Sequence, residues 1–140
     1  MSLNTYLFFD DNCREAFELY RSVFGGEFQE LQTYGDGPPD AEVPESEKDR
    51  IMHVSLAVGS SVLMGSDTGV THGRPPIKGT NFAISVVGES KEHCDEVFAK
   101  LSNGGTVEMP LQETFWGAYF GSWTDRFGVG WMINYQLPQE

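Results

Sequence analysis

The sequence lacks the features that mark several large protein classes. It has no long apolar run of the kind that spans a membrane, and no opening segment of the secretory type is apparent. Lys and Arg together number 9 in 140 residues, against 21 Asp and Glu, and the formal net charge is −12. A nucleic-acid-binding surface needs a basic face to replace counterions, so this charge argues against nucleic acid and against anionic membranes as partners.

Cysteine is also scarce. Cys13 and Cys94 both lie in helical patterns, and neither belongs to a C-x-x-C motif or to a Cys/His spacing typical of a metal site. We expect both to be reduced residues of the core, which indicates a cytoplasmic location.

Aromatic residues and glycines are concentrated near the end of the chain, in residues 113–121 and 125–134. The runs 120–123 and 131–135 favour β-strands, and the turn-forming residues 125–128 between them predict a hairpin. A packed core and a ligand cavity both use many rings, so the pattern by itself leaves the two interpretations open.

The first half of the chain predicts one helix and four strands. The strands are expected at residues 3–9, 28–34, 51–58 and 61–67, and a helix runs from Cys13 to the pair Gly25-Gly26. Asn12 and Glu15 have the spacing of a capping box at its start. Residues 35–50 are acidic and contain proline and glycine, so we expect an exposed, mobile loop that is either a long hairpin connection or a lid.

The second half repeats this order after a linker at residues 68–80. A strand at residues 81–87 is followed by a helix that Ser90 caps and that ends near residue 103, then by a strand at residues 106–112 and the hairpin. The order β-α-β-β-β therefore occurs twice, in module 1 (residues 1–67) and module 2 (residues 81–140) of one α+β domain. If each helix covers one face of its own sheet, the other faces, curved toward each other, form an incomplete barrel around a cavity.

The motifs resemble those of the vicinal-oxygen-chelate superfamily, which includes glyoxalase I, extradiol dioxygenases and the bleomycin-resistance proteins. The resemblance rests on the paired modules, the Phe24-Gly25-Gly26 helix end and the turn at residues 125–128. Residues 6–9, 52–53, 63–67, 109–118 and 131–134 more narrowly resemble the PhnB-like branch, which is also catalogued as a 3-demethylubiquinone methyltransferase. The resemblance implies the two-module barrel and commonly a homodimer, and it implies no settled reaction.

Metal-dependent members of the superfamily carry His or Glu ligands at four strand positions. Transferred to this sequence, these positions hold Asn4, Met64, Asn81 and Met132, and amides and thioethers are poor ligands for the divalent ions concerned. We therefore expect no metal. We also expect no cofactor, because no glycine-rich turn follows a strand and opens a helix.

Two functional hypotheses follow. The first is a metal-free protein that binds an apolar or aromatic small molecule in the cavity, as the bleomycin-resistance relatives do. The expected ligand contacts are Asn4, Tyr6, Phe8, His53, Met64, Asn81, Trp116, Tyr119, Met132 and Asn134. The alternative is a lyase, isomerase or transferase of unknown substrate, in which His53, Asp67 or Glu113 acts as general acid or base.

Overall fold

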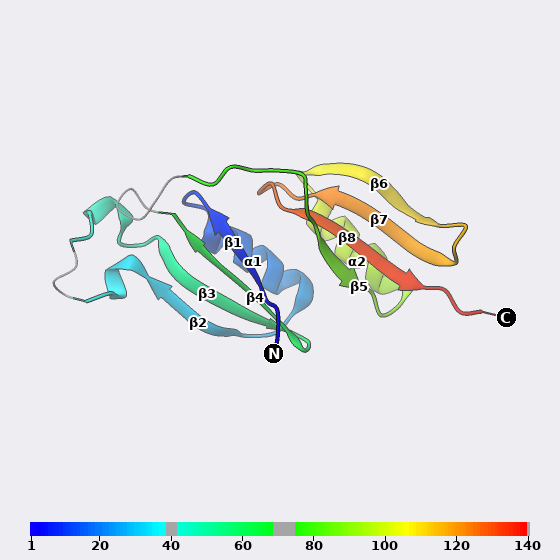
Figure 1. Ribbon diagram of the computed structural model, residues 1–140, viewed down its shortest axis with the longest axis horizontal. Helices are drawn as coiled ribbons and strands as arrows, with labels where there is room; N and C mark the ends of the chain where they lie inside the picture. The colour runs from blue at the N-terminus through cyan, green and yellow to red at the C-terminus, as the bar shows by residue number, and fades with distance from the viewer. Residues whose placement is uncertain (39–41, 69–74, 140) are drawn as a thin grey trace. The chain divides into compact units, whose positions relative to one another are not determined.

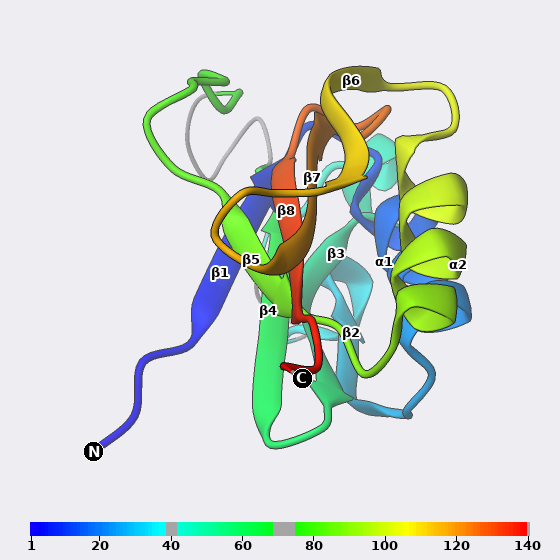
Figure 2. The same ribbon diagram turned by 90° about the vertical axis from the view of Figure 1, so that its right-hand side faces the viewer.

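In this computed structural model the described residues are 1–38, 42–68 and 75–139. They form two units, Met1–Ile77 and Lys78–Glu140, and each unit is described by itself. Figure 1 shows in each unit one helix lying across one face of a four-stranded sheet, and Figure 2 shows the same layers from the side. Residues 39–41 of the expected loop and 69–74 of the expected linker lie outside the described residues.

Unit 1 contains β1 (Thr5–Phe9), α1 (Cys13–Phe24), β2 (Phe28–Thr33), β3 (Ile51–Val58) and β4 (Ser61–Asp67). Two 3₁₀ turns, η1 (Tyr34–Asp36) and η2 (Glu45–Glu47), lie between β2 and β3. The sheet order is β1-β4-β3-β2, in which β1 runs parallel to β4 and the other pairs are antiparallel. The expected strands at residues 51–58 and 61–67 are confirmed residue for residue.

The core of unit 1 lies between α1 and the sheet. The buried stripe of α1 places Phe17 edge-on against Phe9 of β1, with ring centroids 6.1 Å apart. Gly65 of β4 makes this approach possible, because a Cβ at that position would lie 2.6 Å from the Phe17 ring. Leu7 and Phe9 face the helix, and each large side chain buried in this way contributes about 1.5–3 kcal/mol.

The helix α1 is capped from a distant part of the chain. Asn12 occupies the N-cap position, but its side chain makes no capping hydrogen bond, so the expected capping box is wrong. The backbone N–H of Cys13 instead donates to the Asp67 carboxylate at the end of β4, at 2.9 Å. The other oxygen of Asp67 accepts from the N–H of Ile51 at 2.8 Å, so one buried carboxylate ties α1 to β3.

The segment expected as an exposed loop is more ordered at its described ends than its composition indicates. The N–H of Tyr34 donates to the Arg50 carbonyl at 3.0 Å, and the N–H of Gly35 donates to the Lys48 carbonyl at 2.9 Å. Glu47 in η2 is buried. Most described residues of this segment are exposed, as expected, whereas η1, η2 and these backbone bonds add local order that the composition does not predict. A lid function stays a prediction.

Unit 2 contains β5 (Ile84–Val87), α2 (Lys91–Ser102), β6 (Thr106–Glu113), β7 (Ala118–Thr124) and β8 (Gly130–Gln136). Its sheet order is β5-β8-β7-β6, with β5 parallel to β8, so the order of unit 1 is repeated. The Ser90 hydroxyl accepts from the N–H of His93 at 3.0 Å, which confirms the expected cap. The expected start of β5 at residue 81 is wrong, because residues 81–83 form no ladder with β8.

The aromatic end of the chain fills the core of unit 2. Trp123 and Trp131 are opposite each other on β7 and β8 and are fully or almost fully buried, with Phe98 of α2 edge-on to Trp123 at 5.3 Å. Asp125 closes the hairpin by accepting from the N–H groups of Phe127 and Val129, at 2.9 and 3.0 Å. Its second oxygen accepts from the Trp131 indole N–H at 2.9 Å.

These two units confirm the expected α+β fold with β-α-β-β-β order in each half. Each sheet is open and has one face covered by its own helix, while enclosure of a cavity by the two sheets stays a prediction. In the described part of the chain, no helix is long and apolar enough to cross a membrane.

Candidate functional site

The face of the unit 1 sheet that α1 leaves uncovered carries most of the candidate ligand residues of that unit; we call it the open face. Along β1, Leu7 and Phe9 are buried against the helix, whereas Tyr6 and Phe8 are 36% and 59% exposed. Met64 on β4 is in register with Tyr6 and points to the same side. This alternation places the aromatic candidates together, as the sequence predicts.

His53 joins the open face from β3. Its Nδ1 lies 3.0 Å from the Tyr6 hydroxyl, and the two rings are stacked with centroids 5.7 Å apart and an interplanar angle of 26°. Its Nε2 lies 3.6 Å from a carboxylate oxygen of Glu30 on β2. The Phe8 ring lies 5.2 Å from that of Tyr6, so three rings and one carboxylate form a continuous group.

Sequence reasoning missed Glu30. Its strand β2 contains a register shift between Phe28 and Glu30, which changes the alternation that a single sequence reveals. The signal that identifies Glu30 is its pairing opposite Ser55, which places it on the same face as His53, and this pairing is visible only once the strand order is known.

The uncovered face of the unit 2 sheet carries Met132 and Asn134 of β8. Met132 is in register with Ser85 and Ser122, and Asn134 with Phe120, whereas Trp131 and Ile133 of the same strand are buried against α2. Trp116 lies in the turn between β6 and β7, with its ring 6.2 Å from that of Phe120, and is more than half exposed.

Tyr119 is separated from the other candidates. It lies opposite Tyr135 on the helix-facing side of the sheet, where its hydroxyl donates to the Asp95 carboxylate of α2 at 2.6 Å. This hydrogen bond is the main reason that the pKa of Tyr119 is raised to about 12. Tyr119, which is expected among the ligand contacts, therefore lies on the opposite side of the sheet from Met132.

Three further candidates occupy exposed positions. Asn4 precedes β1 and Asn81 precedes β5, so neither lies within a described strand. Glu113 at the end of β6 forms an ion pair with Lys91 of α2 at 2.9 Å, and this partner raises the pKa of the lysine. Glu113 is thus engaged on the helix side of unit 2, away from the uncovered face.

Asp67 has the contacts of a structural carboxylate. Both of its oxygens are occupied by backbone N–H groups, and it is 2% exposed. Burial raises the pKa of Asp67 above its ordinary value, while the two N–H bonds lower it. An acid or base that exchanges protons with a substrate needs an accessible oxygen, and Asp67 does not offer one.

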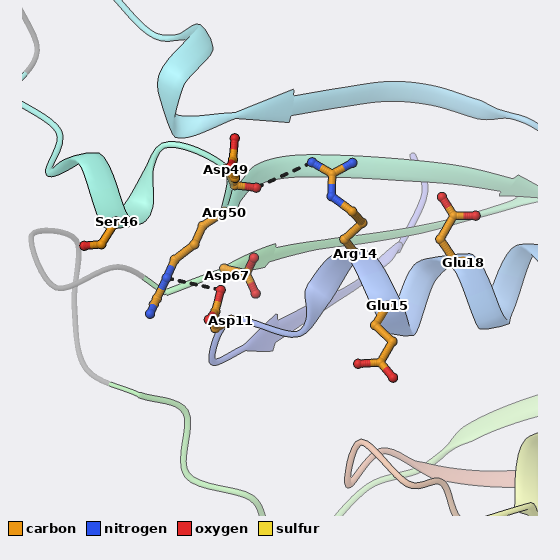
Figure 3. A pocket seen from close by; sticks show the side chains of 8 residues that line it. All are labelled: Asp11, Arg14, Glu15, Glu18, Ser46, Asp49, Arg50 and Asp67. Carbon is orange, nitrogen blue, oxygen red and sulfur yellow. Dashed lines mark hydrogen bonds and ion pairs between the residues drawn. The ribbon is translucent and has the colours of Figure 1, made fainter.

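A charged hollow of about 440 Å³ opens beside Asp67 at the start of α1. Figure 3 shows its lining, in which Arg14 reaches the Asp49 carbonyl at 3.5 Å and Arg50 reaches the Asp11 carboxylate at 3.4 Å. Arg50 also donates to the Thr68 carbonyl at 3.0 Å. Both arginines are engaged with neighbouring protein groups, so the charged side chains that line this hollow interact with the protein itself.

The positions that hold metal ligands in superfamily relatives do not fit a metal here. Asn4 and Asn81 are exposed and lie outside the strands, and Met64 and Met132 offer thioether sulfur to ions that prefer oxygen or imidazole nitrogen. Within residues 1–38, 42–68 and 75–139, no group of three or more His, Cys, Asp or Glu side chains is arranged to hold a metal ion.

A family model described as 3-demethylubiquinone-9 3-methyltransferase matches residues 1–134. The chain belongs to this family. Protein YjdN of Escherichia coli (strain K12) is 32% identical to this chain over 145 residues, which cover 96% of this chain and 95% of YjdN.

Several solved structures share the fold of this chain. Protein PA1353 from Pseudomonas aeruginosa is 43% identical, with a TM-score of 0.86 over 99% of both chains. The PhnB protein from Bacillus cereus is 25% identical, with a TM-score of 0.77 over 96% of this chain and 99% of that one. A glyoxalase/bleomycin resistance protein/dioxygenase family enzyme from Burkholderia phytofirmans PsJN shares the fold, at 17% identity and a TM-score of 0.61 over 96% and 97% of the two chains. The expected likeness to PhnB-type proteins is confirmed, and the chain has the fold of the glyoxalase/bleomycin-resistance protein.

The name of the 3-demethylubiquinone-9 3-methyltransferase family implies a methyl donor. Nucleotide-type donors are bound where a glycine-rich turn joins a parallel strand to a helix. In this chain the β1–α1 turn is Asp10-Asp11-Asn12, and each sheet contains a single parallel pair of strands. These residues do not fit such a donor, and we derive no reaction step through one.

Proposed function

We propose that this chain is a metal-free small-molecule-binding protein whose ligand is an apolar or aromatic compound. The observation that carries the proposal is the open face of unit 1, where Tyr6 and Phe8 stay exposed beside Met64 while their strand neighbours are buried. Adjacent exposed rings beside a polar side chain that can orient a ligand, here His53, are typical of a ligand-binding surface. Membership of a superfamily that includes bleomycin-resistance proteins supports the same function.

The ligand contacts that we propose in unit 1 are Tyr6, Phe8, His53 and Met64, with Asn4 at the start of the open face. In unit 2 we propose Met132, Asn134 and Trp116 on the uncovered face, with Asn81 before β5. Tyr119 is left out because its hydroxyl is bonded to α2.

Neighbouring residues on opposite faces of β4 provide the test. Met64 points to the open face and Leu63 points to the helix, where it is 7% exposed. We expect Met64→Ala to keep the fold and to change the affinity for Nile red, a neutral aromatic dye, by about tenfold, which corresponds to roughly 1.4 kcal/mol. Leu63→Ala should lower the free energy of unfolding by roughly 2–5 kcal/mol and should leave dye affinity in the folded protein nearly unchanged.

Titration with Nile red and unfolding in urea decide between the two faces. If Met64→Ala leaves dye binding untouched while folded Leu63→Ala loses it, the open face is not the ligand surface. Gentle native mass spectrometry of protein purified from cells would in addition show a retained compound and its mass.

The second candidate function is an enzyme that uses His53 as general acid or base. The observation in its favour is the 3.0 Å contact between His53 and the Tyr6 hydroxyl, because a histidine next to a hydroxyl is a common proton-transfer pair. Asp67 and Glu113 have weaker support, since their oxygens are engaged with backbone N–H groups and with Lys91. If the retained compound is converted by the native protein but not by His53→Gln, the enzyme is favoured over the binding protein.

We also propose a homodimer and a cytoplasmic location. The dimer is supported by exposed apolar residues such as Val87 and Phe115, whose burial between copies would be favourable. The location is supported by the free thiols of Cys13 and Cys94, which are typical of reducing compartments. Sedimentation that gives only a mass near 15.6 kDa at micromolar concentration would contradict the dimer.

A further inference from the structure

Three strands contribute one side chain each to a group of adjacent polar side chains on the open face. Tyr6 comes from β1, His53 from β3 and Glu30 from β2. Because β4 lies between β1 and β3, the Tyr6 side chain has to cross β4 to place its hydroxyl 3.0 Å from His53 Nδ1. The Glu30 carboxylate lies 3.6 Å from the opposite nitrogen, Nε2. The imidazole is therefore held between a phenol and a carboxylate.

This arrangement selects the tautomer of His53. A carboxylate only accepts hydrogen bonds, so Glu30 stabilises a proton on the nearby Nε2. The Nδ1 of the neutral ring is then an acceptor, and the Tyr6 hydroxyl donates to it. The lone pairs of the Tyr6 oxygen stay available to accept a hydrogen bond from a bound molecule. The Tyr6 hydroxyl proton is donated to His53 Nδ1.

The neighbours of Tyr6, His53 and Glu30 determine which other side chains act on these three residues. Gln32 lies opposite His53 on β2, and Met64 and Ser66 lie on β4 between the two rings, so these three neighbours bring no charge. Tyr34 interacts electrostatically with Tyr6. Among these neighbours Glu30 alone has an acidic or basic side chain, and its carboxylate lies 3.6 Å from His53 Nε2.

We propose that Tyr6, His53 and Glu30 form a proton relay that binds a phenolic ligand as its phenolate, an assignment that rests on the small-molecule-binding function proposed above. The ligand O–H bond breaks and its proton forms the new O–H bond of Tyr6. The previous Tyr6 proton moves to Nδ1 of His53, which becomes an imidazolium beside the Glu30 carboxylate. No redox partner or further reactant is needed, and the total charge is unchanged.

The neighbouring ring favours a phenol over an aliphatic alcohol. Phe8 lies 5.2 Å from Tyr6 and is 59% exposed, so it offers a flat apolar surface on which an aromatic ring packs. An aliphatic hydroxyl holds its proton too firmly to pass it to an imidazole. A phenol combines a ring for Phe8 with an acidic hydroxyl for Tyr6.

The test uses 4-nitrophenol, whose phenolate absorbs visible light and whose neutral form does not, and 4-nitroanisole, which has the same ring without the acidic proton. We expect bound 4-nitrophenol to be ionised at a pH where the free probe is mostly neutral, with an ionised-to-neutral ratio raised by about tenfold, or one pKa unit. Tyr6→Phe and His53→Gln should abolish this rise, and Glu30→Gln should reduce it. Tyr135→Phe removes a hydroxyl from the helix-facing side of the unit 2 sheet and should leave the rise in ionisation unchanged.

The two probes separate the relay from binding as such. In the expected result, 4-nitroanisole binds the native protein and Tyr135→Phe with similar affinity and binds the three variants of Tyr6, His53 and Glu30 measurably. Cooperative unfolding in urea reports that all four variants are folded. If 4-nitroanisole binds but bound 4-nitrophenol stays neutral, or ionises equally in Tyr6→Phe, the relay is refuted and the binding function stands. If neither probe binds the native protein, both proposals are overturned.

Discussion

Replacement of Asp67 tests the contact that joins three elements of unit 1. Its carboxylate accepts from the N–H of Cys13 at the start of α1 and from the N–H of Ile51 at the start of β3, at 2.9 and 2.8 Å. A buried N–H left without an acceptor costs about 1–3 kcal/mol. Asp67→Ala removes both acceptors and should lower the free energy of unfolding by roughly 2–6 kcal/mol. This is a large fraction of the roughly 5–15 kcal/mol of a typical domain.

Asp67→Asn separates the two bonds. Asparagine has the same shape but retains one acceptor oxygen, so we expect a loss of about 1–3 kcal/mol. The matched control is Asn12→Ala at the sequence-local N-cap. A side chain that capped the helix would cost about 1 kcal/mol on truncation, whereas Asn12 makes no such bond and should cost much less. Urea unfolding followed by far-ultraviolet circular dichroism measures all three variants.

The effect of pH has a definite sign. Burial raises the pKa of Asp67, so the folded protein holds this proton more tightly than the unfolded chain. The contribution of the carboxyl group to stability therefore decreases as the pH rises from about 4, its ordinary value, through the raised value. Asparagine does not titrate, so the destabilisation caused by Asp67→Asn should be smaller at neutral pH than in acid. A large loss for Asn12→Ala with little loss for Asp67→Ala would refute the remote cap.

Other substitutions test packing and ionisation. Gly65→Ala should lower the free energy of unfolding by roughly 1–3 kcal/mol because its Cβ would meet a buried ring at 2.6 Å, whereas Gly79→Ala, where the nearest atom lies at 3.5 Å, should be nearly neutral. Cys13 and Cys94 should not react with a thiol reagent in the native protein and should both react in urea, because burial raises the pKa of each thiol; rapid native reaction would contradict this. The pKa of Tyr119, raised to about 12, predicts stabilisation that is present below about pH 10 and lost as the pH rises through 12, and Tyr119→Phe should abolish this loss in thermal unfolding.

Local patterns were sufficient to predict most elements of the fold. β3 alternates between its two faces, the Gly59-Ser60 turn precedes β4, and α1 has one apolar stripe that ends before Gly25-Gly26. Their bounds are therefore determined by residues within or next to each element. β5 is shorter than expected because residues 81–83 have no partner in β8. Composition indicates which residues are able to pair, and the partner strand decides which of them do.

The contacts that matter for the site depend on residues far apart in the sequence. Asp67 caps a helix that begins 54 residues earlier, and no local motif marks such a pair. Glu30 reaches His53 because β2 pairs with β3 through a register shift. The aromatic character of Tyr119 suggests a ligand contact, and only the pairing with Tyr135 assigns Tyr119 to the helix side. Face assignments therefore require the strand order, which one sequence does not contain.

The strand order also constrains how the chain folds during synthesis. In each unit the first strand to be made pairs with the last, since Thr5 is in register with Leu63 and Ile84 with Trp131. Contacts so distant in sequence require the closure of a long loop before they form, which makes such topologies slow to fold. On the ribosome, β1 has no partner until β4 has emerged, so Tyr6 and Phe8 stand exposed in an unpaired strand for most of the synthesis of unit 1. The nascent chain is then a target for chaperones or for misassociation, and the high negative charge of the protein opposes the latter by repulsion between copies.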